Sequence, residues 1–458
     1  MQIFNTITYA SILTLGLQLP AYAQDFFATV ETASQTSNVD ADSPWQHKAW
    51  LQQNAGFGYR SPAANVNRQS ADLTRAETQL YSALEWRSGP LKARVSGSLT
   101  QDWLPELEQA GLWNGYEFTP EQRQQRRWRL DLSDTYISWE QGDWWLKAGY
   151  QTFAWGEAES LKVTDVLARR DQRWPGQQDL EQTRLPVPAV RATWQNRLDF
   201  VALIEPLPDR LPAAYEEFDP YLALRTGNLA NDPLLIEQPT NKPGFALRWR
   251  EHWGGIDTQV LLAEVDSYEL APNAFELNAN LQPQITLATT RQQIAGVSLQ
   301  TVYGNFLVRS EQAWYHNLSS STLTWVENEA TASAPPGDQW RGMVGADYSG
   351  IHNLVLTGEL TWQRSQTCNC ATDTDRWQNG ASARATYSAI NERLTLQAYA
   401  LVLPGNAGAV WRLSAKWVWS DRLQTELTVV EYDAQQPEDT LYAYRHNDSL
   451  LLNLRWAL

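Results

Sequence analysis

Apolar and polar residues alternate with a period of two along this chain, in segments of about ten residues. The last segment places Leu450, Leu452, Leu454, Trp456 and Leu458 on one face, and Leu451, Asn453, Arg455 and Ala457 on the other. The same alternation recurs at residues 91–100, 354–363 and 411–419. Successive side chains of a strand point to opposite sides, so each segment predicts a strand with one apolar and one polar face.

A soluble β-sandwich also alternates, but two features favour a membrane barrel. The predicted strands run for about nine residues or more, which is long for a soluble sheet, and their polar faces carry Arg and Lys. Their apolar faces carry Trp near the ends, as an aromatic girdle would. The 23 Trp and 18 Tyr stand against two Met, and both rings favour membrane–water interfaces. We therefore predict an all-β fold, a transmembrane antiparallel β-barrel.

Short and long connections alternate between the predicted strands. The tight turns are Ser88-Gly89-Pro90, Gln141-Gly142-Asp143, Gln195-Asn196, Gly254-Gly255, Gly304-Asn305, Gly350 to Asn353, Asn391-Glu392 and Ser420-Asp421. The long polar loops are 104–125, 157–187, 209–243, 269–284, 319–337, 366–376 and 433–445. With a first strand near 47–59, the pattern predicts about 18 strands, within a range of roughly 14 to 18, with both termini in the periplasm.

Residues 1–23 predict a signal peptide. A short apolar stretch ends at Ala21-Tyr22-Ala23, an A-x-A cleavage site, although no Lys or Arg precedes the stretch. A membrane anchor would need about 20 apolar residues, and Gln18 and Pro20 interrupt this run. We expect Sec export, cleavage near Ala23, a short periplasmic segment at 24–45, and a barrel over 46–458. The predicted location is the Gram-negative outer membrane, with its lipids and its assembly machinery as partners.

Charge shapes the expected lumen. The formal net charge of −16 argues against nucleic-acid partners. The polar faces are nevertheless rich in cations, namely Lys92, Arg94, Arg129, Lys147, Arg248, Arg250, Arg412, Lys416 and Arg455. Fewer acidic residues lie on these polar faces: Glu85, Asp131, Glu359 and Glu426. This pattern favours a positive lumen that concentrates anions. The alternative is that acidic loop residues fold inward and satisfy these cations, which would make a plug.

The stretch from Gly149 to Arg191 is the most distinctive. It reads as a strand ending at Trp155-Gly156 and a loop of about 30 residues. The loop carries Glu157, Glu159, Asp165, Asp171, Asp179 and Glu181 against Arg169, Arg170, Arg173 and Arg184. Such a loop can fold on itself through ion pairs and form a constriction in the barrel mouth.

The order W-G-E, charged loop, then R-L-P-V-P resembles the porin-like outer-membrane proteins of a domain-of-unknown-function family. The resemblance covers about 45 residues; elsewhere only the barrel pattern agrees. It implies transport or export of an unknown substrate, beside lipoprotein-like partners and an RND-type exporter. It implies no catalytic residues.

Three further features admit two interpretations each. The connection 209–243 mixes acidic and apolar residues. It could be an ordinary surface loop, or an inserted loop that presents an apolar surface to hydrophobic cargo. Cys368 and Cys370 suit a local disulfide or an inert pair better than a metal site, which would need more ligands. Asp134 falls on the apolar phase between Leu132 and Tyr136, which suggests a bulge or a subunit contact.

Catalysis has little support. The chain has five His, and His446 near Ser449 is the best candidate pair for a lipid-modifying enzyme. No G-x-S-x-G, metal-spaced His pair or phosphate loop is present. We therefore expect no enzyme, no cofactor and no metal. The favoured function is a monomeric or homotrimeric porin for small, anionic or amphiphilic solutes. The alternative is an outer-membrane partner of an export system or periplasmic protein.

Overall fold

The computed structural model describes residues 43–60, 73–112, 118, 120–212, 216, 218–220, 234–236, 242–277, 283–319, 322–326, 329–333, 336–367, 374–403, 408–435 and 441–458. The predicted signal peptide, nearly all of the segment 24–45, and the pair Cys368 and Cys370 lie outside these residues.

A 19-stranded sheet forms the wall. Its strands are β1 (Trp45–Gly58), β2 (Leu73–Ser88), β3 (Leu91–Asp102), β4 (Trp128–Leu132), β5 (Thr135–Gln141), β6 (Trp144–Gln151), β9 (Val187–Trp194), β10 (Leu198–Leu203), β12 (Gly244–Trp253), β13 (Ile256–Asp266), β16 (Arg291–Tyr303), β17 (Phe306–Ser319), β20 (Pro336–Ile351), β21 (Leu354–Thr367), β22 (Thr374–Ala389), β23 (Leu394–Leu403), β24 (Gly408–Ser420), β25 (Leu423–Asp433) and β26 (Ser449–Ala457). Since β4 and β5 both pair with β3, they are two parts of one strand. The predicted 18-stranded antiparallel barrel is therefore confirmed.

Smaller elements lie in the long connections. Helices α2 (Leu104–Gln109) and α3 (Pro120–Arg127) join β3 to β4. Short pieces follow in the later connections: β7 (Arg169–Arg170), η1 (Leu180–Thr183), β8 (Arg184–Leu185), β11 (Leu234–Ile236), β14 (Ala271–Leu277), β15 (Pro283–Ala288), β18 (Thr322–Val326), β19 (Glu329–Ser333) and η2 (Tyr442–Tyr444). Within the described part of the chain, no helix has the length and apolarity needed to cross a bilayer.

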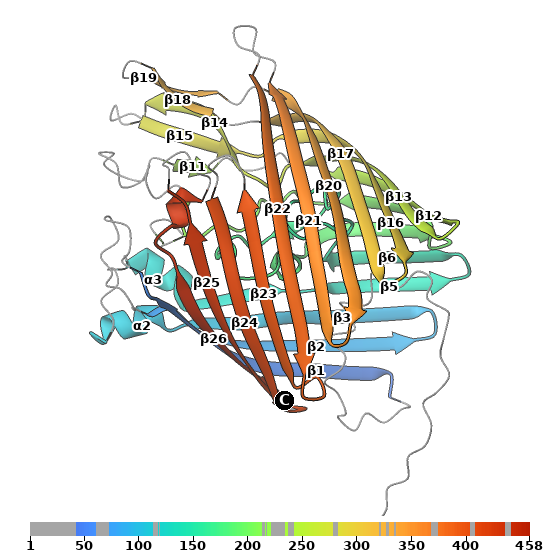
Figure 1. The fold of residues 1–458 in the computed structure, drawn as a ribbon, viewed down its shortest axis with the longest axis horizontal. Helices are drawn as coiled ribbons and strands as arrows, with labels where there is room; N and C mark the ends of the chain where they lie inside the picture. Colours follow the sequence, from blue (N-terminus) through green and yellow to red (C-terminus); the bar gives the residue numbers. More distant parts are fainter. Residues whose placement is uncertain are drawn as a thin grey trace, which may run out of the picture. The chain divides into compact units, whose positions relative to one another are not determined.

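The first and last strands close the barrel. Strand β1 pairs antiparallel with β26 from Trp50↔Ala457 to Gly58↔Ser449, and Figure 1 shows the two strands side by side. The side chains of Asn54 and Asn453 meet at this seam, with the Asn453 amide donating to Asn54 Oδ1 at 2.8 Å. Closure matters because it leaves neither strand with an unpaired edge in lipid.

The tight turns lie where the sequence predicts them. Each joins two neighbouring wall strands, such as β5 to β6 through Gly142 and β20 to β21 through Asn353. Gly142 and Asn353 both adopt φ of 60°, a conformation that Gly and Asn tolerate better than other residues. The strand ends that the longer connections join lie at the opposite end of the barrel, as the alternation of loop lengths predicts.

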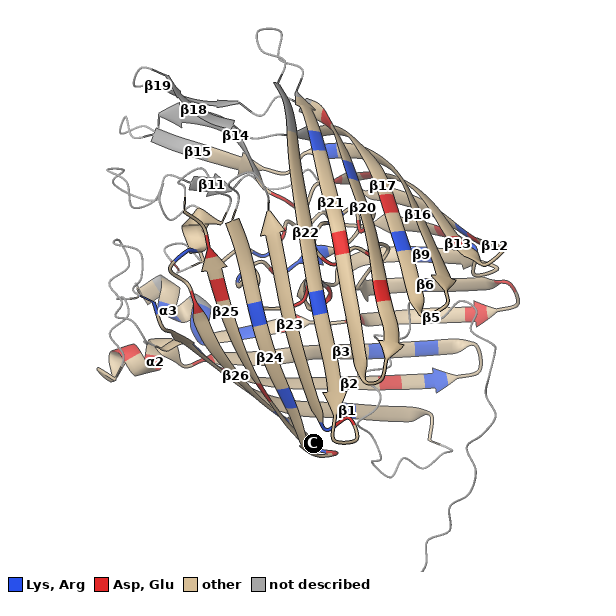
Figure 2. Ribbon diagram, viewed as in Figure 1, with Lys and Arg blue, Asp and Glu red and all other residues tan. Residues whose placement is uncertain are grey.

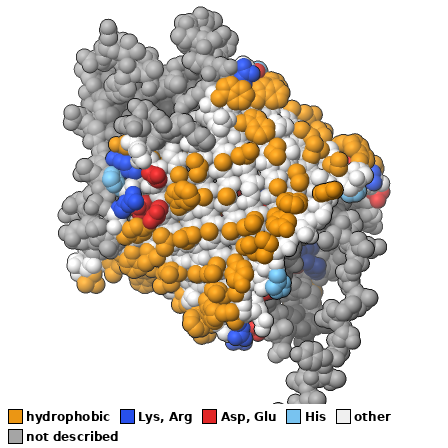
Figure 3. Space-filling model, viewed as in Figure 1, with side chains coloured by type: hydrophobic (Ala, Val, Ile, Leu, Met, Phe, Trp, Pro, Cys, Tyr) orange, Lys and Arg blue, Asp and Glu red, His pale blue; other side chains and the backbone are white. Residues whose placement is uncertain are grey.

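The outer face is apolar and bounded by aromatic rings. Exposed rings near the short-turn end are Trp144, Trp194, Trp253, Tyr303, Tyr387 and Trp419. Those near the loop end are Trp128, Phe245, Trp340, Trp377 and Trp411. On β24, Trp411 and Trp419 are separated by about 26 Å of strand, enough for a tilted strand to cross most of the apolar band. Figure 3 shows apolar rows along the strands, with charged side chains near the edges.

A bulge between β4 and β5 changes which residues face lipid. Gly97 pairs with Leu132 and Arg94 pairs with Tyr136, so the β4–β5 strand holds one extra residue at Ser133–Asp134. Before the bulge, Leu132 is exposed on the outer face; after it, Ile137 is. The sequence pattern places Tyr136 on the apolar phase, which is wrong, because the extra residue shifts the alternation by one. The bulge that Asp134 suggested is confirmed.

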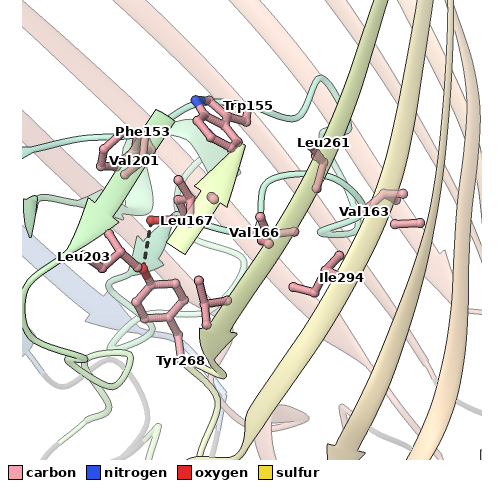
Figure 4. Packing of buried hydrophobic residues seen from close by; sticks show 14 of the residues in the cluster. Phe153, Trp155, Val163, Val166, Leu167, Val201, Leu203, Leu261, Tyr268 and Ile294 are labelled. Atoms are coloured by element: carbon pink, nitrogen blue, oxygen red, sulfur yellow. Dashed lines mark hydrogen bonds between the residues drawn. The ribbon is translucent and has the colours of Figure 1, made fainter. Parts of the chain in front are cut away.

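Inside the barrel, an apolar core fills one side of the lumen. It joins Phe153, Trp155, Ala158, Val163, Val166 and Leu167 to inward residues of β9, β10, β12, β13, β16, β17 and β20. Figure 4 shows side chains of this core converging, with the Tyr268 hydroxyl directed at the carbonyl oxygen of Leu167. The strand predicted to end at Trp155-Gly156 ends at Gln151 instead. The letters F-A-W alternate as in a strand, but both rings belong to this core.

Candidate functional site

The connection between β6 and β9, residues 152–186, lies inside the barrel; we call it the inserted loop. Its atoms bind inward side chains of strands far around the wall, from β13 and β17 to β24 and β25. An ordinary outer loop would contact only its neighbouring strands. The inserted loop therefore occupies the lumen and sets how much of it stays open.

Two wall carboxylates hold the start of the inserted loop. Glu359 of β21 accepts hydrogen bonds from the backbone amides of Glu159, at 3.0 Å, and Ser160, at 3.2 Å. Glu311 of β17 accepts from the amide of Glu157, and at 2.8 Å from the hydroxyl of Thr164. Both carboxylates are almost completely buried. Buried acceptors satisfied by backbone donors fix the position of a loop strongly, because leaving them unsatisfied is costly.

Wall donors satisfy the loop carbonyls next to these contacts. The Tyr315 hydroxyl donates to Val163 O at 2.6 Å, and Gln259 donates to Trp155 O at 2.6 Å. Arg309 donates to Glu157 O at 2.7 Å. The loop is thus bound on both its donor and its acceptor groups by β13 and β17.

On the opposite wall, the loop meets β24 and β25. Arg412 of β24 forms an ion pair with Asp179. The Tyr432 hydroxyl of β25 donates to the carbonyl oxygen of Pro175. Gly176 lies between them at φ 80°, where an added Cβ would lie 3.1 Å from Val410 and 3.3 Å from Tyr432. The inserted loop therefore spans the lumen from one wall to the other.

Ion pairs inside the loop hold its shape. Arg170 and Arg184 both contact Asp165 Oδ2, at 3.3 and 2.9 Å. Burial alone would raise the pKa of Asp165, but these guanidinium groups outweigh it and hold the pKa below its usual range. Asp171 binds Arg173 at 2.5 Å, and this contact lowers its pKa in the same way against the effect of burial.

Glu159 behaves differently from these acids. Its carboxylate lies 2.5 Å from Arg384 of β22 and 3.6 Å from Arg309 of β17. Burial dominates over both, and the nearby charges of Glu359 and Asp347 add to it, so the pKa of Glu159 rises to about 7. This acid therefore titrates near neutral pH while it is part of the contact between the loop and the wall.

The structure gathers the predicted constriction residues within one folded loop. Glu157 and Glu159 contact the β17–β22 side, and Asp165 lies at the centre with its partners Arg170 and Arg184. Arg169 donates to the carbonyl oxygen of Pro208 at 2.7 Å, and Asp171 is held by Arg173 and Arg210. The charged residues of the loop therefore bind one another and the wall, as a folded insertion requires.

All predicted lumen cations lie on the inward phase, but several are neutralised. Arg248 lies 2.6 Å from Asp199, and Arg250 lies 3.4 Å from it. Arg129 binds Asp131 at 2.7 Å, and Lys92 binds Glu85 at 3.0 Å. Figure 2 shows charges of both signs along the wall strands. The expectation that inward acids are few is wrong: Glu77, Asp102, Asp199, Glu311 and Asp347 lie on the same phase.

The remaining predicted wall residues face the less covered part of the lumen. Arg94 donates to the Tyr81 hydroxyl at 3.1 Å, Lys147 lies 3.8 Å from the Tyr136 ring, and Arg455 lies 4.4 Å from the Trp50 ring. Lys416 pairs across β24 and β25 with Glu426. The cations Arg191, Arg309, Arg341 and Arg384 also face inward, and the same period-two pattern could have identified them.

The longer connection 209–243 is described only in part. Its Asp209 accepts from the amide of Arg170 at 2.8 Å and from Gln172 at 2.6 Å, so the start of this connection supports the inserted loop. Arg210 reaches Asp131 of β4 at 2.7 Å. Of the apolar residues on which the cargo interpretation depended, Leu222 and Leu224 lie outside the described residues, and Leu234, Leu235 and Ile236 form β11.

The enzyme candidates do not form a catalytic arrangement in the described residues. The Ser449 hydroxyl is fully buried and donates to the carbonyl oxygen of Asn447 at 2.6 Å. Asp448 accepts from the amide of Tyr432 and pairs with Arg60 at 2.5 Å. These contacts tie the end of the β25–β26 connection to the wall. Among the described His, Cys, Asp and Glu residues, no group of three could hold a metal ion.

Residues 7–203 match the family model described as "Protein of unknown function (DUF1302)". The matched range includes the wall from β1 to β10 and the inserted loop. No curated protein matches the sequence. Among solved structures, OccAB4 of Acinetobacter baumannii matches 92% of this chain and 100% of its own, with 8% identity and a TM-score of 0.51.

Two further solved structures are similar. OccAB1 of Acinetobacter baumannii covers 93% of this chain and 99% of its own, at 9% identity and TM-score 0.49. The outer-membrane protein opdK of Pseudomonas aeruginosa matches 90% of this chain and 98% of its own, with 9% identity and a TM-score of 0.48. At these identities the likeness concerns the fold alone.

Proposed function

We propose that this protein is an outer-membrane channel for small solutes, narrowed by the inserted loop and favouring anions. The observation that carries the proposal is the contrast between two parts of the lumen wall. Under the loop, inward side chains such as Arg248, Glu311 and Tyr315 are almost completely buried. On β1, β3 and β6, the long inward side chains of Trp50, Arg94 and Lys147 stay partly exposed, although small neighbours such as Ser96 and Ser98 are buried.

A partly exposed, polar inner wall supports a water-filled path along that side. Low-dielectric walls focus the field of the charges that line such a path. Because the cations under the loop are paired with acids, the charge that a passing solute meets comes mainly from the open side. Arg94 and Lys147 lie there, and among the described residues neither forms an ion pair with a carboxylate. The expected selectivity is therefore for anions.

The test is ion conductance of the purified barrel in planar bilayers. With a KCl gradient across the bilayer, we expect a reversal potential that favours Cl⁻ over K⁺. Replacing residues 157–184 by a short Gly-Ser linker should raise the single-channel conductance several-fold, because the loop would no longer cross the lumen. A barrel that migrates as folded on an unheated gel yet carries no current, or prefers K⁺, contradicts the proposal.

A second candidate is a plugged barrel that serves as the outer-membrane partner of an export system, such as an RND-type exporter. The apolar core around Val163, Val166 and Leu167 favours it, because dense packing opposes spontaneous movement of the loop. This candidate predicts that the intact protein carries no ion current, and that current appears only in the variant whose residues 157–184 are replaced by the linker. The same bilayer experiment thus separates the two functions.

A further inference from the structure

Four cations lie close together on the open side of the lumen, and three of them surround one ring. Lys92 and Arg94 come from β3, Lys147 from β6 and Arg191 from β9. Lys92, Arg94 and Arg191 all lie close enough to Lys147 for their charges to repel it. Like charges brought together inside a barrel oppose each other unless counter-charge is supplied.

Tyr136 stands at the centre of this cluster. The Lys147 ammonium lies 3.8 Å from its ring centroid and that of Lys92 lies 5.9 Å away. Arg94 is the direct cross-strand partner of Tyr136. Lys147 pairs with Ser138, two residues further along the same face. Direct and diagonal neighbours of this kind lie within roughly 8 Å of each other, so Arg94 and Lys147 flank one ring.

Acidic groups balance this cluster only in part. Lys92 is paired with Glu85 at 3.0 Å, and Arg191 with Asp199 at 2.9 Å. Asp134 is near enough to attract both Arg94 and Lys147, but its carboxylate accepts from the amide of Thr152 at 2.8 Å. No carboxylate in the described chain lies within ion-pair distance of Arg94 or Lys147.

Aromatic rings, instead of acids, hold these two cations. Arg94 bonds the Tyr81 hydroxyl at 3.1 Å, and Lys147 lies 5.8 Å from the Trp145 ring as well as over Tyr136. The Arg191 guanidinium lies 4.9 Å from Trp145. A ring attracts a cation through its quadrupole without adding negative charge. The rings therefore position the cations and leave their charge available to a ligand.

The bulge at Ser133–Asp134 creates this arrangement. Without the extra residue, Tyr136 would face lipid, and the inward-facing Arg94 and Lys147 would have no ring between them. Gly149 accommodates the bulge from the neighbouring strand: at φ 130°, a Cβ there would lie 2.3 Å from Thr135 O. A local irregularity that rotates one ring into a cluster of cations is typical of a functional site.

We propose that Arg94 and Lys147 form a binding site for small aromatic carboxylates. The carboxylate would pair with the guanidinium and ammonium groups, and the planar ring of the solute would contact the edges of Tyr81 and Tyr136. This inference rests on the proposed channel, since it names a solute class and the residues that select it. An inorganic anion would use the charges but gain nothing from the rings.

Isothermal titration of the detergent-solubilised, full-length barrel with sodium benzoate tests the site. At constant ionic strength, benzoate should bind more tightly than acetate, and chloride should give no saturable heat. Lys147→Gln and Arg94→Gln should each weaken benzoate binding by about tenfold, the effect of losing one charge-assisted contact. Lys147→Arg should keep most of the affinity.

Lys416→Gln is the matched control, because Lys416 also faces the lumen but lies across the barrel beside Glu426. It should change the affinity by less than about twofold. Equal weakening by Lys416→Gln, or equal binding of benzoate and acetate, overturns the site. Titration does not need conduction, so binding without current would refute the channel and retain the site. If the barrel conducts but Lys147→Gln leaves its benzoate affinity unchanged, the channel is retained and the binding site is refuted.

Discussion

The hydroxyl of Tyr315, on the barrel wall, donates a hydrogen bond of 2.6 Å to the carbonyl oxygen of Val163, in the inserted loop. Both residues are buried, Tyr315 at 2% and Val163 at 0% exposure. The contact therefore lies in the core, where water cannot replace it. It links the two structures whose relative position decides whether the lumen is open.

Removing that hydroxyl should loosen the loop and leave the wall intact. Tyr315→Phe keeps the packing of the ring but leaves a buried carbonyl unsatisfied, at a cost of roughly 1–3 kcal/mol to loop docking. We expect faster amide exchange at residues 160–168, and no change in amides paired between β1 and β26. Hydrogen exchange with mass spectrometry measures both. Tyr303→Phe is the control, because Tyr303 is 82% exposed at the short-turn end. Equal exchange in the two variants would show that the hydroxyl does not hold the loop.

The pKa of Glu159 makes loop docking depend on pH. Its pKa is about 7 in the docked loop, against an ordinary value of 4.5. The docked state therefore holds the proton more tightly than the released state does. Docking is strongest below about pH 4.5 and weakens as the pH rises through 7, because ionising a buried carboxyl near Glu359 and Asp347 costs more than its contacts with Arg384 and Arg309 return.

Exchange of the inserted loop, corrected for the intrinsic pH dependence of amide exchange, should thus increase from pH 5 to pH 8. Glu159→Gln cannot ionise at this position and should reduce this increase. Glu108→Gln serves as the control, because Glu108 binds Arg123 in the β3–β4 connection, away from the inserted loop. If protection of the loop in the unmodified protein instead rose with pH, the raised pKa of Glu159 could not be what controls docking.

Much of this fold could be predicted from sequence because a barrel wall is locally determined. Alternation in β26 shows which side chains face lipid, and short turns such as Gly142 show where strands reverse. The sequence also indicates a folded, charged loop after β6. These features depend on neighbouring residues only.

The remaining features depend on contacts between distant residues. No local signal shows that Phe153 and Trp155 leave the wall for an interior core, because their spacing suits a strand equally well. The partner of Arg248 is Asp199, 49 positions earlier in the chain, so only the barrel geometry shows that the cation is neutralised. The shift of Tyr136 from lipid to lumen follows from a single extra residue. In the sequence, the sign of this extra residue is Asp134, an acid on the apolar face of its strand.

Gly149 should be required for the bulge beside it. Its φ of 130° is unfavourable for any residue with a side chain, and a Cβ would lie 2.3 Å from Thr135 O and 2.8 Å from Tyr136 Cα. Gly149→Ala should destabilise the barrel by about 1–3 kcal/mol or displace the bulge. Unfolding in urea, followed by tryptophan fluorescence in detergent, measures this. Gly358→Ala should have little effect, because an added Cβ at Gly358 meets nothing within 4 Å. Equal stability of the two variants would show that the chain tolerates a side chain at the bulge.

The lipid-facing assignment predicts a dependence on depth. Leu360 of β21 is 63% exposed on the outer face, several residues from either end of its strand, whereas Ile256 of β13 is 44% exposed on the same face, next to the tight turn at Gly254-Gly255. Arginine costs about 2–4 kcal/mol near the bilayer midplane and about 0–1 kcal/mol near the interface. Leu360→Arg should therefore reduce the folding free energy in lipid vesicles markedly, and Ile256→Arg only slightly. Both side chains point outward, so orientation alone cannot produce a difference between them. Equal costs would place the two residues in the same environment and contradict a bilayer around this wall.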